Sequence, residues 1–120
     1  MRNKYAELLM TTVANAHLWH FYTKSFAQHA AFGTFYEDLQ SLADTYIEGD
    51  IGVNGPLVPT SNTFHYLGLE DSILGITALK SFTKVIRDDN DKLSEFGLVA
   101  SLENIMILID QTLFKLKQLS

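Results

Sequence analysis

The sequence contains no cysteine among its 120 residues. Disulfide bonds, thiolate metal sites and cysteine nucleophiles are therefore all excluded. Only two prolines are present and 47% of the residues are hydrophobic, a composition that is typical of a folded chain rather than a disordered one. A single domain spanning residues 1–120 is long enough to bury one core without disulfides or a structural metal.

Positive charge is also scarce, with nine Lys and Arg against 14 Asp and Glu and a formal net charge of −5. Nucleic-acid binding needs clustered basic residues, and here they are scattered, so we do not expect nucleic acid as a partner. No apolar run approaches the ~20 residues that cross a bilayer. The first ten residues lack the apolar stretch of a signal peptide. We therefore expect a cytoplasmic protein without a membrane partner.

Helical periodicity is the strongest pattern that the chain does contain, and it predicts helices over about 3–22, 25–49, 69–87 and 92–119. At the start of the second, "SFAQ" matches a capping box, in which Ser25 caps the helix and Gln28 reaches back to it. Residues 49–68 hold both prolines and several glycines, so we predict that they are not helical. "RDDND", residues 87–91, is predicted to be a tight connection.

The lengths of these connections predict the topology. Short links between the first and second helices, and between the third and fourth, favour antiparallel hairpins. The middle link of about 18 residues can reach nearly 60 Å, whereas the second helix is only about 36 Å long. The link can therefore cross the whole bundle. We predict an all-α, ferritin-like four-helix bundle, up-down-down-up, with a long crossover between helices 2 and 3.

Histidines and carboxylates form two groups along the second helix and its neighbour. His17, His20 and His29 lie within thirteen residues of one another, and Asp44 and Glu48 are one helical turn apart. His29 and Asp44 are about 22 Å apart along a continuous helix, whereas metal–ligand bonds are about 2 Å long. These residues can share an ion only if a second copy of the helix runs antiparallel to the first, and a two-fold axis then creates two identical sites.

The same residues also have simpler interpretations. A histidine beside aromatic residues is a common packing residue. Asp44 and Glu48 alone are compatible with a solvent-exposed pair. His65, in the middle link, is expected to be a surface loop residue.

The spacing of His17, His29, Asp44 and Glu48 resembles the ferroxidase ligand pattern of the Dps proteins (DNA-binding proteins from starved cells), which are small members of the ferritin superfamily. The resemblance implies an iron site in which one chain supplies the histidines and another the carboxylates. It further implies Fe(II) oxidation, classically by peroxide, in a homodimer formed through helices 1 and 2, with a dodecameric shell as the larger assembly. Imidazole with carboxylate also suits Zn(II) or Mn(II).

Gly33 is one departure from that family, which usually has a further aspartate at this position. The loss of one carboxylate is expected to weaken iron binding and any ferroxidase turnover, and it leaves open whether the site holds one ion or two. Glu37, one turn further along the helix, is a further candidate ligand. The alternative function is a non-catalytic oligomeric helical bundle that keeps the fold with a degenerate metal site.

A second departure lies in the first helix, where Leu18 separates His17 from Trp19, residues that are adjacent in the family. His20 is therefore either the true counterpart of the family's first histidine or an added ligand. The basic N-terminal tail that many family members use on DNA is not found, so DNA binding is not carried over.

Overall fold

The chain is helical throughout most of its length in the computed structural model, which describes residues 1–60 and 65–118. Within these residues it has no strand, and its elements are α1 Arg2–Tyr22, α2 Phe26–Asn54, the short 3-10 helix η1 Leu69–Asp71, α3 Ser72–Lys92 and α4 Phe96–Gln118. The predicted all-α class with four helices is confirmed.

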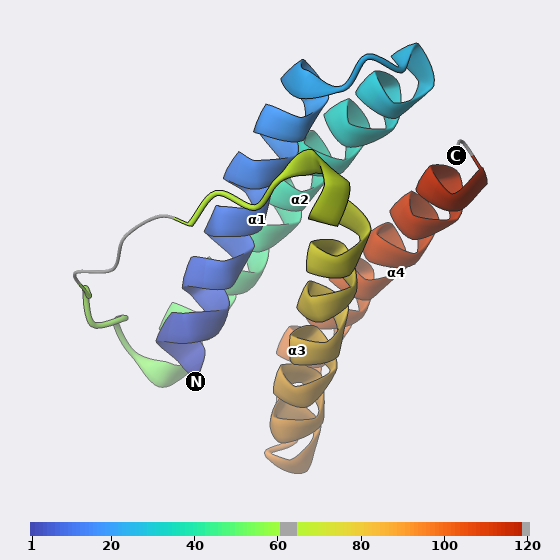
Figure 1. The fold of residues 1–120 in the computed structure, drawn as a ribbon. Coiled ribbons are helices and arrows are strands. Elements are labelled where there is room, and N and C mark those ends of the chain that lie inside the picture. The colour runs from blue at the N-terminus through green and yellow to red at the C-terminus, as the bar shows by residue number, and fades with distance from the viewer. Residues whose placement is uncertain (61–64, 119–120) are drawn as a thin grey trace.

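The helices form two hairpins that pack against each other (Figure 1). α1 packs on α2 and α3 on α4, and the hairpins meet through α2 with α4 and α1 with α3. α1 and α4 run in one direction, and α2 and α3 run in the other (Figure 1). The link between α2 and α3 therefore joins opposite ends of the bundle.

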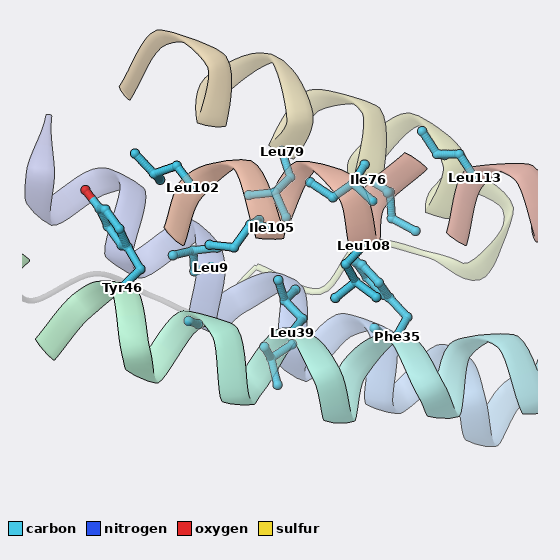
Figure 2. Close-up of a cluster of buried hydrophobic side chains, with 14 of the residues drawn as sticks. Leu9, Phe35, Leu39, Tyr46, Ile76, Leu79, Leu102, Ile105, Leu108 and Leu113 are labelled. Carbon is cyan, nitrogen blue, oxygen red and sulfur yellow. The ribbon is translucent and has the colours of Figure 1, made fainter. Parts of the chain in front are cut away.

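The core lies between the two hairpins and draws on all four helices (Figure 2). On each helix its members recur at spacings of three and four, so each helix presents one apolar stripe to the others. Ile73, near the beginning of α3, lies outside this core and is exposed. The following residues are all fully buried: Leu9, Phe35, Leu39, Ile76, Leu79, Leu102, Ile105 and Ile109.

The turn between α1 and α2 shows why α2 begins where it does. The Ser25 hydroxyl accepts a hydrogen bond from the Gln28 backbone N–H at 3.2 Å, which satisfies one of the free donors of the first turn. The Gln28 side chain does not return to Ser25 as predicted. It accepts from the Thr23 hydroxyl at 2.7 Å, and the Thr23 hydroxyl accepts from the Ser25 N–H instead.

α2 continues beyond the predicted end at Gly49, so the prediction that residues 49–54 are not helical is wrong. Glycine costs a helix about 1 kcal/mol relative to alanine, but a partly buried ion pair holds this last turn in place. The Asp50 carboxylate lies 2.9 Å from Nε of Arg2, and Asn54 donates to the same carboxylate at 2.9 Å. The helix ends at Gly55, whose φ of 90° favours glycine.

α3 also continues through residues 87–91, so the predicted connection there is wrong. Asn90 is buried, and its side chain donates to the carbonyl of Ile86 within the helix at 2.9 Å. The reversal comes three residues later than predicted, at Ser94, which has a φ of 58°. The Glu95 N–H then donates to the Asn90 carbonyl, which satisfies one of the free acceptors at the end of α3.

Hydrogen bonds from side chains of α1 hold the link between α2 and α3 near both of its ends. At the beginning, the Arg2 guanidinium donates to the Gly55 carbonyl, and the Asn3 amide donates to the carbonyl of Val58. These contacts hold the start of the link against the first turn of α1.

At its other end, the link is held by two buried side chains of α1. Asn15 accepts from the Leu67 N–H at 3.0 Å and donates to the His65 carbonyl at 3.3 Å. The Trp19 indole donates to the Leu67 carbonyl at 2.7 Å. Backbone groups that would otherwise lack a partner inside a long loop are thus satisfied by side chains.

α4 is the one helix, in the described part of the chain, that is long and apolar enough to cross a membrane by length and composition, with a mean hydropathy of 1.3. Core helices meet the same criterion. Leu102, Ile105 and Ile109 of α4 are fully buried against the other helices.

Candidate metal centre

Three predicted site residues meet where α1 turns into α2. His20, near the end of α1, stacks on His29, in the first turns of α2, with ring centroids 3.6 Å apart and planes at 22°. The His17 and His20 rings are 6.4 Å apart. The structure therefore brings all three predicted nitrogen ligands of one chain to the same end of the hairpin.

Two reciprocal hydrogen bonds fix which nitrogen of His20 and His29 carries the proton. Nδ1 of His20 lies 2.7 Å from the His29 carbonyl oxygen, and Nδ1 of His29 lies 2.6 Å from the His20 carbonyl oxygen. A carbonyl can only accept, so each Nδ1 must be the donor. The neutral ring then has its lone pair on Nε2, which is the protonation pattern of a metal-binding histidine.

These bonds also have a structural role. The His20 carbonyl lies in the last turn of α1, where carbonyl groups lack a partner within the helix. The His29 imidazole satisfies this carbonyl and so joins the end of α1 to the beginning of α2. The pair therefore caps the end of α1.

Gly33 provides the space that this arrangement needs. A Cβ atom at position 33 would lie 3.0 Å from Cε1 and 3.1 Å from Nδ1 of His20. The space beside Gly33, where the family usually has an aspartate side chain, is thus occupied by the edge of the His20 imidazole. Sequence reasoning treated Gly33 only as a missing carboxylate, because the ring that approaches it comes from another helix.

His17 has a different environment. Its ring is stacked on Tyr36 with centroids 4.0 Å apart and planes at 14°, and it also stacks on Phe21 at 4.9 Å. No hydrogen bond among the described residues fixes the proton of His17 on one nitrogen. Tyr36 also meets His20 edge-on at 5.5 Å, and it is half-buried against the edge of the hydrophobic core.

The predicted carboxylates lie on the same hairpin but far along α2. Asp44 and Glu48 are both exposed, and neither forms a hydrogen bond or ion pair with any residue in 1–60 or 65–118. They line an open groove of about 860 Å³ together with residues of α1 and of the link: Lys4, Glu7, Leu8, Thr11, Leu57, Thr60 and His65.

The groove contains residues that sequence reasoning did not assign to the site. His65 is exposed as predicted, but it lines the same groove as Asp44. Glu7 is positioned there by α1 and accepts a hydrogen bond from the Thr60 hydroxyl. No spacing in the sequence relates these residues to Asp44, because the fold of the link brings them there. Glu37 lies exposed between the two groups.

The histidine cluster and the carboxylate groove cannot serve one ion within one chain. His29 and Asp44 are separated by fifteen residues of the continuous helix α2, which is about 22 Å. In the described part of the chain, no three His, Asp or Glu side chains are close enough together to hold a metal ion. A site built from the predicted ligands therefore requires a second copy of the chain.

Residues 20–116 match the model of a family of unknown function, DUF5856. The chain belongs to this family. The DUF5856 match includes His20, His29, Gly33, Asp44 and Glu48, whereas His17 lies outside it. No curated protein and no solved structure matches the chain.

Proposed function

We propose that two copies of this chain pack through α1 and α2, with their α2 helices antiparallel across a two-fold axis. The dimer binds divalent metal ions, with Fe(II) as the leading candidate. The observation that carries the proposal is the position of the two ligand groups at opposite ends of one rigid hairpin. A two-fold axis across the hairpin sets His29 of one chain beside Asp44 of the partner subunit. The same axis creates a second, identical site.

The outer face of α1 supports this mode of packing. Met10, Ala14, His17 and Phe21 follow one another at spacings of four, three and four, which places them on one stripe. The side chains of Met10 and Phe21 are 44% and 64% exposed. An apolar stripe beside an incomplete ligand set is suited to burial against another copy of itself.

The residues fit a first-row divalent cation. His29 and a histidine of α1, His17 or His20, supply imidazole nitrogen, and Asp44 and Glu48 supply carboxylate oxygen. This combination suits Fe(II), Zn(II) and Mn(II). Neither carboxylate has a partner among residues 1–60 and 65–118, which favours metal binding by their oxygens. Their negative charge favours the added positive charge of an oxidised ion.

Fe(II) is the substrate in the proposed reaction, and the oxidant is peroxide. Two Fe(II) ions each lose one electron, and one hydrogen peroxide takes up both electrons with two protons to give two water molecules. The chain's own residues hold the iron and compensate its charge. Gly33 supplies no oxygen ligand, so we expect slower oxidation than a site with a third carboxylate would allow.

The order and direction of the helices favour the finer assignment to a ferritin-like, Dps-like bundle. Two antiparallel hairpins joined by a long crossover are the arrangement of that superfamily. A closed shell of such dimers is the larger assembly that the resemblance implies.

Metal binding by the purified chain tests this proposal. We expect anaerobic Fe(II) to bind at one or two ions per chain, and oxidation on peroxide addition to exceed that in a buffer control. His29→Ala and Asp44→Asn should each abolish binding while the protein remains helical. Asp38→Asn, which alters another exposed carboxylate of α2, is the matched control and should bind normally.

The alternative is a non-catalytic oligomeric bundle, and the imidazole edge that fills the space at Gly33 favours it. Under that alternative, the His20–His29 stack serves only to cap α1. Background oxidation together with no bound metal in the unmodified protein would leave this structural role, and a monomer in solution would contradict both functions.

A further inference from the structure

We infer that Phe26 is an anchor residue by which two copies of this chain hold each other, and that its ring binds in the open groove of the partner subunit. The occupant of the groove is therefore a second copy of the chain. This inference rests on the proposed function, because it uses the pairing of two copies through α1 and α2, but it does not depend on bound metal.

Phe26 is unusually open to solvent for an aromatic residue. It is the first residue of α2 and is 85% exposed, the highest value among the large apolar side chains of the described residues. Phe21 and Tyr22, across the turn at the end of α1, are also more than half exposed. Exposed apolar residues that gather at one place are typical of a surface that a partner covers.

The groove at the other end of the hairpin has apolar walls that can receive such a ring. α1, α2 and the link each contribute to these walls, which consist of Ala6, Leu8, Met10, Ile47 and Leu57. Asp44 and Glu48 lie beside Ile47 on α2 and line the same groove. A ring that binds there therefore covers apolar surface next to the two carboxylates.

The register of the proposed dimer brings Phe26 to this groove. A two-fold axis that sets His29 beside Asp44 of the partner subunit passes α2 between residues 36 and 37. Phe26 and Ile47 lie equally far from that point, about 16 Å along α2 in opposite directions, so Phe26 is level with Ile47 of the partner subunit. Phe26 and Asp44 are also about five full turns apart, which places both on the same face of α2.

The charges of the two ends of the hairpin are complementary as well. Residues 8–36, which surround the turn between α1 and α2, contain no Asp or Glu, and they include Lys24 and three histidines. The described residues that line the groove include three carboxylates and one lysine. An antiparallel pair sets each turn against the partner's groove and so brings unlike charges together, whereas a parallel pair would bring like charges together.

The affinity of the dimer in EDTA tests the anchor without metal. Each dimer buries two Phe26 rings, so we expect Phe26→Ala to raise the Kd of the dimer about a hundredfold in sedimentation equilibrium. Phe114→Ala is the matched control, because Phe114 is also exposed but lies on α4. It should change the Kd by no more than about twofold. Circular dichroism on both variants checks that the helices remain folded.

The lack of cysteine in the sequence allows a direct test of the register. Within one chain, positions 26 and 47 are about 31 Å apart along α2, which is too far for a disulfide bond. The double variant Phe26→Cys with Ile47→Cys should therefore form disulfides only between two chains. We expect it to give a covalent dimer on air oxidation in EDTA, whereas Phe26→Cys alone and Ile47→Cys alone should remain uncross-linked.

An unchanged Kd for Phe26→Ala, or a double variant that cross-links no more than the single variants, would show that Phe26 does not anchor the dimer. If Asp44→Asn abolishes Fe(II) binding in that case, the proposed function stands. If the cross-link forms but the unmodified protein binds no Fe(II), Phe26 anchors a dimer that lacks the proposed metal site. A chain that is monomeric in EDTA overturns the inference, and one that is also monomeric with Fe(II) overturns the proposed function as well.

Discussion

Replacement of Asn15 by leucine should release the link between α2 and α3 from α1. Asn15 is 5% exposed, and its side chain forms two hydrogen bonds with the link, from the Leu67 N–H and to the His65 carbonyl. Leucine has a similar volume but can form neither bond. The link is one wall of the groove that holds Asp44 and Glu48, so its attachment also shapes the carboxylate half of the site.

The expected loss of unfolding free energy depends on the groups that these two hydrogen bonds join. Each hydrogen bond contributes a net ~1 kcal/mol, and a buried group that is left without a partner costs about 1–3 kcal/mol. The His65 residue is exposed, so water replaces Asn15 at its carbonyl, whereas Leu67 is half-buried and its N–H loses more. We expect Asn15→Leu to lower the free energy of unfolding by about 2 kcal/mol, which lowers Tm by roughly 6–10 °C in a domain of this size.

Urea denaturation followed by circular dichroism measures the loss, and hydrogen exchange at the Leu67 amide locates it. Asn104→Leu is the matched control, since Asn104 is exposed on α4 and surface changes stay within about 0.5 kcal/mol. We expect the Leu67 amide to exchange much faster in Asn15→Leu while the core amides of α4 keep their relative protection. Equal unfolding free energies for the two variants would show that the hydrogen bonds of Asn15 do not stabilise the link.

Three further predictions concern the polar groups of the core. Burial, with a contribution from the Asp50 carboxylate, raises the pKa of Tyr46 to about 12. Tyr46 therefore stabilises the fold fully below pH 10, and this contribution is lost as pH rises from 10 to 12, at up to ~1.4 kcal/mol per pH unit. Tyr46→Phe should reduce the slope of unfolding free energy against pH in this interval, and an unchanged slope would contradict the shift. Arg2→Met leaves Asp50 buried without its ion pair and should cost about 2 kcal/mol in urea, less than a fully buried pair because Arg2 is one-third exposed. Adding Asp50→Asn should recover at least half of that loss, and no recovery would show that the charge is not the cause. The Tyr5 hydroxyl donates to Thr83 Oγ1 at 2.8 Å, because Thr83 itself donates to a carbonyl of its own helix. Tyr5→Phe should therefore cost about 1 kcal/mol, and a thermal scan that shows no change would contradict this.

The helices were predictable because they depend on local patterns. Periodicity gave the four helices and most of the core, and "SFAQ" gave the beginning of α2. Their ends were predicted less well because long-range contacts determine them. The last turn of α2 depends on an ion pair between Asp50 and Arg2, which are 48 residues apart, and no local signal for a helix end reveals such a contact.

In the candidate site, too, the features within one helix were predictable and those that depend on the tertiary fold were not. The distance between His29 and Asp44 was predictable, since both lie on one continuous helix. The pairing of His20 with His29 was not, because it depends on the geometry of a three-residue turn between α1 and α2. The reason for a glycine at position 33 was not predictable either, since the side chain that approaches it, His20, comes from α1. The spacing of His17, His29, Asp44 and Glu48 can be read from the sequence, whereas the stacking of His20 on His29 cannot.

In the proposed dimer, each metal site takes its ligands from two chains. One variant, His29→Ala, lacks the nitrogen ligand of α2, and another, Asp44→Asn with Glu48→Gln, lacks the carboxylate ligands. Each variant alone should bind no Zn(II). When they are unfolded together and refolded in equal amounts, about half of the two-fold pairs are mixed, and each mixed pair has one intact site of two.

Equilibrium dialysis of the refolded mixture against Zn(II) is the decisive measurement. We expect the mixture to recover about one quarter of the metal bound by the unmodified protein, from random pairing at a two-fold interface. A mixture that binds no more Zn(II) than either variant alone would contradict it.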